Sequence, residues 1–381
     1  MEIEPLDLSD RASMRRFLAV AEDVNRGDPA WIPPLRLERT MTFSPRHNAY
    51  LRRAETRYWI ASQAGRDVGR ISAQIDPVET AHRGRTVCHF GCLAAVDDQA
   101  VFSALLAAAE TFARAHGAAE MTGPFTFSIN EETGLLVAGF DTPPMVMMGH
   151  DPAWCDARIK AAGYEKATDV HAYLLDLERP LGRAAEGMLT RPLPAGTRIR
   201  TIDFSDYRAD IARIVDIFND AWSGNWGFVP LTEEETEEMA GRLRPLLSRD
   251  LVQFAEVEGE AVAFMVVLPN INEAIRDLDG RLLPFGWAKA LWRLKVSGLA
   301  SARVPLMGVR RHVAGTLAGS ALPLQLIGAV WPHARRRGIR SVELSWILED
   351  NLAMRRILER LGADAYKTYR LYGRPLAPVT S

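Results

Sequence analysis

The sequence predicts an α/β protein made of two tandem domains, each built around a mixed β-sheet. The main observation is an internal repeat, because the segment 3–10 (IEPLDLSD) returns as 199–206 (IRTIDFSD), with an amphipathic helix after each copy. A repeat of this length is far longer than a solenoid unit and indicates two copies of a whole domain. The chain of 381 residues is also long enough for two domains of ordinary size.

The first half alternates strands and helices. Apolar residues recur at helical spacing over 9–24, with Ser9 as the expected N-cap, and Gly65 marks the turn of a β-hairpin. These elements define an N-terminal domain, 1–177. We expect, in order, helix 9–24, strands 56–63, 67–75 and 86–93, helix 98–116, strand 120–123, helix 152–162 and a strand pair over 164–177.

The second half repeats this order after a stretch rich in proline and glycine, 178–197, which is the expected linker. The second domain, 198–381, differs from the first by an insertion, 270–304, between its third and fourth strands. We expect strand 198–203, helices 205–221 and 232–248, strands 251–257, 260–268 and 305–310, helix 320–336, strand 340–347, helix 351–361 and strand 365–372.

The composition argues against several classes of function. A net charge of −2 gives no general attraction to nucleic acid, and the sequence has no run of about 18 apolar residues that could cross a membrane. The three cysteines form neither a paired framework nor a metal-ligand pattern, and the acidic N-terminus is unlike a signal peptide. We therefore expect a cytoplasmic protein with no metal and no nucleic-acid partner.

The order β-α-α-β-β-β-α-β-α-β in each half resembles the GCN5-related N-acetyltransferase (GNAT) fold, and the pair resembles the tandem GNAT acyltransferases. A strand, then Asn351, then a helix ending at Gly362 is a common GNAT ending. Closer still, the chain resembles the bacterial ceramide synthase group, which implies transfer of a fatty acyl group from a thioester to a sphingoid amine. The segments that carry this resemblance are 31–34 (WIPP), 225–230 (NWGFVP), 345–349 (SWILE) and 367–372 (KTYRLY).

GNAT enzymes hold the pyrophosphate of coenzyme A on backbone N–H groups at the start of a helix. The first half has Asp97 and Asp98 at this position, which would repel phosphate, whereas the second half has a basic loop with two glycines. We therefore expect the donor to bind the second domain and the first domain to be degenerate. The expected donor contacts are Val309, Arg310, Arg311, Gly315, Thr316, Gly319, Ser320 and Asn351.

The resemblance also implies that a backbone N–H near Val309 polarises the thioester carbonyl. The loop departs from the usual GNAT pattern, because His312 and Leu317 occupy its ends. This departure leaves the phosphopantetheine of an acyl carrier protein open as an alternative donor to acyl-CoA.

The amine must lose a proton before it attacks, so the site needs a base or a water relay. Glu343 lies within a strand, on the face opposite to Trp346, and is the first candidate. A solvent-facing strand position is the alternative interpretation of this residue. His312 and Glu349 compete for the same role.

The leaving thiolate must gain a proton, and many GNAT enzymes supply it from a tyrosine on the last helix. Leu358 stands at that position here. Tyr369 on the following strand is the expected substitute, with Tyr366 and Tyr372 beside it. Packing is the alternative role for these aromatic residues.

Aromatic residues are also the candidates for substrate contact. Asn225, Trp226 and Phe228 follow the first helix of the second half, where GNAT folds place the acceptor, and Trp346 lies near Glu343 in the sequence. In the insertion, Trp287 shares a helical face with leucines, while lysines and arginines lie elsewhere. This pattern is typical of a helix at a membrane interface, or of a lid over an acyl chain, or of a helix packed on the domain.

We therefore expect an N-acyltransferase that uses acyl-CoA or an acyl carrier protein to acylate a sphingoid base or 3-oxo-sphinganine. Peripheral contact with the inner membrane fits such a lipid amine. Two alternatives stay open, namely a GNAT acetyl- or aminoacyltransferase acting on a small amine, and a non-catalytic scaffold that binds acyl-CoA or lipid.

Overall fold

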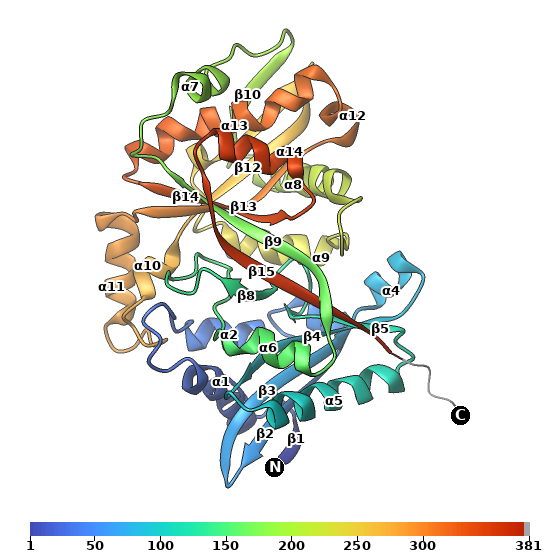
Figure 1. Ribbon diagram of the computed structural model, residues 1–381. Helices are drawn as coiled ribbons and strands as arrows, with labels where there is room; N and C mark the ends of the chain where they lie inside the picture. Colours follow the sequence, from blue (N-terminus) through green and yellow to red (C-terminus); the bar gives the residue numbers. More distant parts are fainter. Residues whose placement is uncertain (377–381) are drawn as a thin grey trace. The chain divides into compact units, whose positions relative to one another are not determined.

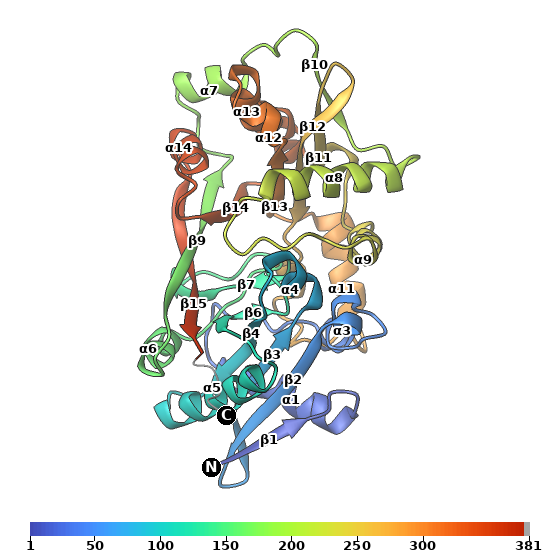
Figure 2. The same cartoon turned by 90° about the vertical axis from the view of Figure 1, so that its right-hand side faces the viewer.

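The computed structural model describes residues 1–376, apart from the side chains of Leu317 and Ala318, and the chain forms two compact units (Figures 1 and 2). Unit 1 comprises Met1–Val170, Ile275–Gly286 and the chain from Lys367 onward. Unit 2 comprises His171–Ala274 and Trp287–Tyr366.

The sheet of unit 1 has the strand order β1-β2-β3-β4-β5-β15. Its neighbours are antiparallel except for β4 and β5, which are parallel. The strands are β1 (Glu2–Leu6), β2 (Glu55–Gln63), β3 (Arg66–Ile75), β4 (Val87–Ala95), β5 (Glu120–Gly123) and β15 (Asp364–Pro375).

Two helices cover opposite faces of this sheet, because side chains alternate between the faces along each strand. Ile60 belongs to the core beneath α1 (Arg11–Val24), whereas the next residue, Ala61, belongs to the core beneath α5 (Gln99–Ala115). The remaining elements of unit 1 are α2 (Arg36–Thr42), α3 (Ala49–Arg53), α4 (Pro77–Arg83), β6 (Phe125–Thr126), β7 (Glu132–Thr133), β8 (Leu135–Ala138) and α6 (Trp154–Ala161).

The sheet of unit 2 has the matching order β10-β11-β12-β13-β14-β9. The strands from β10 to β13 pair antiparallel, and β13 pairs with β14 in parallel. The strands are β10 (Thr197–Thr201), β11 (Val252–Val257), β12 (Glu260–Pro269), β13 (Ser301–Val309), β14 (Ser341–Leu348) and β9 (Glu165–Asp176).

The two main helices of unit 2 repeat the arrangement of unit 1. Ile217 of α8 (Tyr207–Trp222) lies near Gly308, whereas Leu322 of α13 (Leu317–Arg336) shares the other core with Met265. The remaining helices are α7 (Arg183–Leu189), α9 (Glu233–Leu243), α10 (Ile271–Ile275), α11 (Gly286–Trp292) with a π-helical turn at Arg293–Ser297, α12 (Arg311–Ala314) and α14 (Leu352–Arg360), besides a short 3-10 helix at Arg249–Leu251.

The two units therefore confirm the α/β class and the tandem repeat, but their final strands are exchanged. β15, at the end of the second half, pairs with β5 of unit 1, and the His171–Asp176 part of β9 belongs to unit 2. The expected segments 1–177 and 198–381 divide the chain by sequence, and the compact units divide it differently at these strands and at Ile275–Gly286 of the insertion.

Several local predictions need correction. Asp10, rather than Ser9, caps α1 and accepts a hydrogen bond from the backbone N–H of Ser13. The expected strand pair over 164–177 is one continuous strand, β9, and the linker contains α7. β13 begins at Ser301, so the insertion ends sooner than expected. Residues 124–153 of unit 1, which include β6 to β8, form an extra connection that the periodicity did not indicate.

Candidate active site

The parallel strands of unit 2 separate at one end. β13 and β14 pair from Ser301–Ser341 to Val304–Leu344, and among the described residues this pairing stops there. β13 nevertheless continues to Val309 and β14 to Leu348. A shift in the pairing of β13 with β12, between Leu306 and Arg303, marks a bulge at the same level. A bulge re-aims the strand that carries it, which fits the divergence of β13 from β14.

Glu343 lies at the point where these strands separate, and it is fully buried with 0% of its surface exposed. Ser345 Oγ donates to its Oε1 at 2.6 Å, and the Tyr366 hydroxyl donates to its Oε2. Arg303, also fully buried, places Nε 3.3 Å from Glu343 Oε1 and 2.8 Å from Ser345 Oγ. The structure therefore excludes the solvent-facing alternative for Glu343. Both of its oxygens are occupied, so the carboxylate is held in place by its neighbours.

Tyr366 is the accessible member of this network. Its side chain is half-buried, whereas Glu343 is fully enclosed. Trp346 is also half-buried, and the guanidinium carbon of Arg303 lies 4.3 Å from the centre of a Trp346 ring. The Trp346 Nε1 atom is itself buried and has no hydrogen-bond partner among the described residues. A partially accessible aromatic residue with such an N–H can donate to a bound carbonyl.

The basic loop after β13 contains one structural arginine and one exposed arginine. Arg310 Nη2 contacts Asp216 Oδ2 at 2.6 Å, and its Nε donates to the Ala261 carbonyl at 3.2 Å. Arg311 lies at the surface, where its Nη1 donates to Ser223 Oγ at 3.0 Å. Of the two, Arg311 is therefore better placed to meet a phosphate from solvent.

At the start of α13 the backbone of Val313 packs closely against Gly319. Thr316 caps the helix by accepting from the Gly319 N–H at 3.0 Å, and its hydroxyl donates to the Val313 carbonyl at 2.7 Å. A Cβ on Gly319 would lie 1.9 Å from that carbonyl oxygen, so only glycine fits. Gly315, Ser320 and His312 are exposed around this turn. The Leu317 side chain lies outside the described residues.

Other predicted residues have structural roles that the contacts define. Asn351 caps α14 by accepting from the Met354 N–H at 3.1 Å. Phe228 is buried against Phe218 of α8, with 6.0 Å between ring centroids, whereas Asn225 and Trp226 are half-buried beside it. Phe228 therefore anchors its loop through packing.

Tyr369 does not join the Glu343 network in unit 2. It belongs to the part of β15 assigned to unit 1, is fully buried, and donates its hydroxyl to the Gly149 carbonyl at 3.2 Å. The Tyr372 hydroxyl likewise donates to Asp156 Oδ1 at 2.5 Å. Of the three tyrosines of this strand, Tyr366 is the one whose hydroxyl contacts Glu343.

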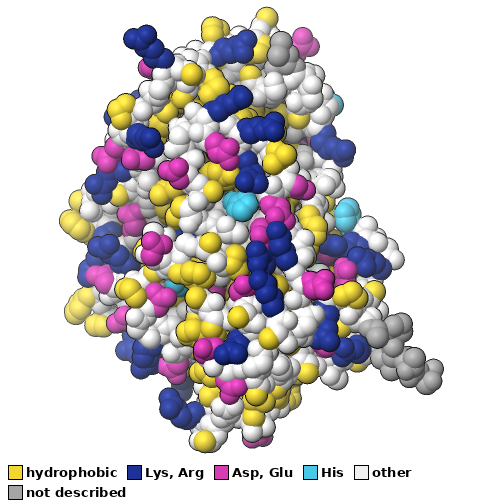
Figure 3. Space-filling view, in the orientation of Figure 1, with side chains coloured by type: hydrophobic (Ala, Val, Ile, Leu, Met, Phe, Trp, Pro, Cys, Tyr) yellow, Lys and Arg dark blue, Asp and Glu magenta, His cyan; other side chains and the backbone are white. Residues whose placement is uncertain are grey.

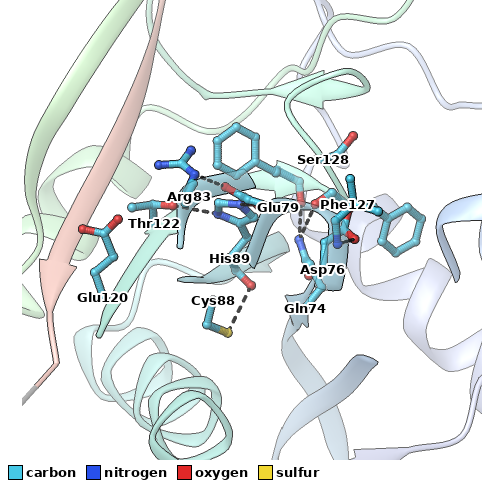
Figure 4. Close-up of polar contacts among 12 residues, drawn as sticks. Gln74, Asp76, Glu79, Arg83, Cys88, His89, Glu120, Thr122, Phe127 and Ser128 are labelled. Carbon is cyan, nitrogen blue, oxygen red and sulfur yellow. Dashed lines mark hydrogen bonds and ion pairs between the residues drawn. The ribbon is translucent and has the colours of Figure 1, made fainter. Parts of the chain in front are cut away.

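Unit 1 has a different polar network at the corresponding strand positions. His89 pairs with Thr122 across β4 and β5 in the same register as Arg303 and Glu343 across β13 and β14. His89 Nδ1 lies 2.7 Å from Thr122 Oγ1, and its Nε2 lies 2.5 Å from Glu79 Oε2 (Figure 4). These three side chains are all buried.

The opening between the strands is filled in unit 1. The Phe125 carbonyl lies so close to Gly91 of β4 that an added Cβ would be 1.6 Å from its oxygen. Gln74 holds this segment by donating to the carbonyls of Phe125 and Phe127, both at 3.1 Å (Figure 4). In unit 2 the chain instead passes from β14 almost directly into α14.

The helix start that corresponds to the basic loop is also occupied in unit 1. Asp98 caps α5 by accepting from the Ala100 N–H, and Asp97 pairs with Arg158 at 2.8 Å. Trp154 Nε1 donates to the Ala95 carbonyl at 3.1 Å. The helix start of unit 1 therefore presents two carboxylates, whereas Thr316 caps the helix start of unit 2 and leaves Arg311 and Ser320 exposed beside it.

Sequence reasoning missed Arg303 and Ser345 as members of the site. An arginine in an otherwise apolar strand, 301–309, was the available signal for a buried ion pair. It also missed Gln325, which is buried on α13 with neither side-chain polar atom hydrogen-bonded among the described residues. The signal there was one amide within the apolar run 322–331.

Comparison with known proteins gives two close relatives of nearly full length. The chain is 47% identical over 378 residues to the bacterial ceramide synthase of Caulobacter vibrioides (strain NA1000 / CB15N), covering 98% of each chain. It is 43% identical over 363 residues to protein YghO of Escherichia coli (strain K12), covering 95% of this chain and 93% of that protein. The chain belongs to the bacterial ceramide synthase family. As a member of this family it is an N-acyltransferase.

Solved structures place this ceramide synthase family member in the tandem GNAT fold. A tandem GNAT protein from the clavulanic acid biosynthesis pathway matches with a TM-score of 0.59, 17% identity and 99% coverage of both chains. A GCN5-related N-acetyltransferase from Sphaerobacter thermophilus matches with a TM-score of 0.52, 16% identity, and 99% and 96% coverage. A scan against protein-family models finds none that matches.

Two further properties bear on the chemistry. Among residues 1–376, no group of three or more His, Cys, Asp and Glu side chains is arranged to hold a metal ion. No helix in that part of the chain is long and apolar enough to cross a membrane.

Proposed function

We propose that this protein transfers a fatty acyl group from a thioester to the amine of a sphingoid base or its 3-oxo precursor, forming a ceramide-type amide. Membership of the ceramide synthase family supports this substrate class. The observation that carries the proposal is the Glu343–Tyr366 pair where β13 and β14 separate in unit 2, a position that the chain itself fills in unit 1.

The donor in this proposal is acyl-CoA or an acylated carrier protein, and it binds unit 2. The pantetheine arm, which both donors share, would lie between β13 and β14 beyond Val304, with a backbone N–H near Val309 turned toward the thioester carbonyl. The phosphates would meet Arg311 and the start of α13, where Ser320 is exposed. The Asn351 side chain already accepts the Met354 N–H as the cap of α14, so we assign Asn351 only a minor role in donor binding.

In this proposal Tyr366 exchanges protons with the substrates, and Glu343 accepts and returns the phenol proton. The amine nitrogen attacks the thioester carbon, and the Tyr366 oxygen accepts its proton while the phenol proton passes to Glu343. The C–S bond then breaks, and the proton returns through Tyr366 to the leaving sulfur. Arg303 and Ser345 hold the Glu343 carboxylate for this exchange. His312, exposed on α12, and Glu349, just after β14, are the alternative bases.

The acceptor in this proposal is a lipid amine. Trp346 presents an unoccupied buried N–H beside the Glu343 network, and the half-buried Asn225 and Trp226 supply amphipathic surface in the same unit. Since both the amine and the acyl chain prefer a bilayer to water, we infer that the enzyme works as a peripheral protein at a membrane surface.

The test is product analysis by mass spectrometry. The full chain is incubated with sphinganine or 3-oxo-sphinganine and with acyl-CoA of different chain lengths, and in parallel with an acylated carrier protein. We expect the corresponding N-acyl lipid from at least one donor. Acetylation of a small polar amine in preference to these lipids, or no amide product from either donor, would refute the proposal.

A further inference from the structure

The helix of the insertion packs in the opposite sense from an ordinary surface helix. A surface helix normally buries its large apolar side chains and exposes its small or polar ones. In α11 the buried residue is Ala290, whereas Trp292 is 56% exposed, and Trp287 and Leu291 are exposed as well. This arrangement contradicts the alternative in which these large side chains pack on the domain.

Exposed apolar side chains are concentrated in this one segment. Of the twelve large hydrophobic side chains that are exposed in the described part of the chain, six lie between Leu283 and Val296. They include each of the aromatic residues in that set, which are Phe285, Trp287 and Trp292. An exposed apolar patch of this kind marks an interaction site.

The charge of α11 and the turn 293–297 indicates which kind of partner this surface binds. Between Gly286 and Ser297 the sequence contains Lys289, Arg293 and Lys295 and no Asp or Glu, although the whole chain carries a net charge of −2. Lys289 and Lys295 are exposed on α11 and the following π-helical turn. In Figure 3 hydrophobic side chains and Lys or Arg side chains appear together at the left edge, where Figure 1 draws α11.

The insertion is firmly held at its base. Asn270 Nδ2 donates to Ser301 Oγ at 2.9 Å, and Glu273 accepts from the Ala300 N–H at 2.9 Å, so the two ends of the insertion are tied together. Arg293 Nη1 donates to the Ala274 carbonyl at 2.9 Å. The helix is thereby fixed in position while its large side chains remain exposed.

We propose that α11 and the turn 293–297 form a docking surface for a lipid bilayer that contains anionic phospholipids. Tryptophan and leucine enter the boundary between headgroups and acyl chains, and lysines contact anionic headgroups. Because the segment from Gly286 to Ser297 combines exposed tryptophans with basic residues and has no acidic residue, it is complementary to an anionic headgroup layer. The proposal rests on the proposed function in one respect, since a lipid-acylating enzyme needs access to a membrane.

Vesicle flotation of the full chain tests this surface. We expect the protein to float with vesicles of phosphatidylglycerol and phosphatidylcholine, less with phosphatidylcholine alone, and less at high salt. The double variant Trp292→Asp/Val296→Asp should lose at least about tenfold in vesicle partitioning, because each side chain then carries a charge into the apolar boundary. Lys289→Glu/Lys295→Glu should lose the preference for phosphatidylglycerol, also by about tenfold or more.

Matched controls lie in unit 1. Leu37→Asp replaces another strongly exposed hydrophobic side chain, and Arg66→Glu reverses another exposed charge, so both should bind vesicles as the parent protein does. Failure of the parent protein to bind phosphatidylglycerol vesicles would overturn the proposal. So would equal binding of the aspartate double variant, retention of purified acyl carrier protein in place of vesicles, or a dimer that this variant dissociates.

The docking surface and the proposed reaction can fail separately. With a short-chain acyl thioester and a water-soluble amine, in the absence of vesicles, the docking variants should form amide at the parent rate. A protein that binds vesicles as described but acylates no sphingoid amine refutes the proposed function and leaves the surface intact. A protein that acylates the amines with no contribution from α11 refutes the surface alone.

Discussion

At the scale of single residues, the proposed acid–base chemistry is shared between Glu343 and Tyr366, which are joined by a hydrogen bond. The sequence pointed to the carboxylate, but the structure encloses it completely and leaves Tyr366 as the group that solvent can reach. A fully buried carboxylate with both oxygens engaged cannot itself touch an amine. It can stabilise the partner that does, which is the role we assign to Glu343.

Tyr366→Phe tests this division directly. The change removes one hydroxyl and keeps the ring, so we expect turnover to fall by roughly 10²–10⁴-fold, as for other acid–base groups, with donor affinity retained. The measurement is a single-turnover acylation assay. Tyr207→Phe is the control, because that hydroxyl also lies in unit 2 but donates to the Ala240 carbonyl. Normal turnover in Tyr366→Phe would transfer the role to His312, Glu349 or water.

Glu343→Gln should be more damaging to stability than Tyr366→Phe. Removing one partner of a buried ion pair leaves Arg303 uncompensated, at a cost of about 3–5 kcal/mol. Loss of the Tyr366 hydroxyl should lower the free energy of unfolding by only about 1 kcal/mol, apart from the cost of leaving Glu343 Oε2 without this hydrogen-bond donor. Urea unfolding of both variants measures the difference. Equal free energies of unfolding would mean that the Arg303–Glu343 pair contributes little to the fold.

Asp151 of unit 1 gives a prediction in pH. Burial raises the pKa of this carboxyl to about 6, against the hydrogen bond from the Leu136 N–H and with some contribution from Glu132. Because the folded pKa lies above the unfolded one, the unfolded chain loses this proton first as pH rises. Stability should therefore fall between about pH 4 and pH 6 and level off above that.

The variant Asp151→Asn isolates this effect, since an amide oxygen can still accept from Leu136. Its free energy of unfolding, relative to the parent protein, should increase from pH 4 to about pH 6 and then stay constant. Asp141→Asn, an exposed residue of the same connection, serves as control. A difference that does not vary with pH would show that Asp151 titrates normally.

At the scale of elements, periodicity predicted the helices and strands far better than their partners. Gly65, Gly117 and Asn351 carried local signals that mark real turns and ends. No local sequence signal predicted the exchange of β9 and β15. The residue pattern of a strand shows which of its faces is buried, but not which sheet the strand joins. The connection 124–153 was missed for a related reason, since short irregular strands have no period to detect.

The filled opening of unit 1 makes a prediction at Gly91. A Cβ there would collide with the Phe125 carbonyl, so Gly91→Ala must displace the segment that closes the opening. We expect a loss of about 1–3 kcal/mol or more in the free energy of unfolding. Gly315→Ala is the control, because nothing lies within 4 Å of a Cβ added there. Equal stability of the two variants in urea would contradict the close packing of Phe125 on β4.

At the scale of the whole molecule, two units of one topology differ most clearly for the donor at the helix start that follows β4 in unit 1 and β13 in unit 2. The sequence anticipated this from the contrast between Asp97–Asp98 and Arg310–Arg311. It could not anticipate that Arg310 would be occupied with Asp216 while Arg311 stayed exposed, because that distinction depends on contacts with α8. Nor could it pair Arg303 with Glu343, which lie forty residues apart in adjacent strands.

The exchanged strands also determine how the units should be tested. A fragment ending near residue 176 would lack β15, whose Arg374 donates to Glu110 at 2.8 Å and to the Ala162 carbonyl at 2.9 Å. Such a fragment omits part of the sheet of unit 1. Tests of either unit therefore use the full chain with substitutions.

The central claim is that unit 2 alone binds the acyl donor, and titration calorimetry of the full chain with coenzyme A tests it most directly. We predict one site per chain, weakened at least about tenfold by Arg311→Glu, because that change places a negative charge where phosphate should bind. Arg158→Glu, at the corresponding helix start of unit 1, should leave the affinity unchanged. Two sites per chain, or one site that Arg158→Glu removes and Arg311→Glu does not, would contradict the account.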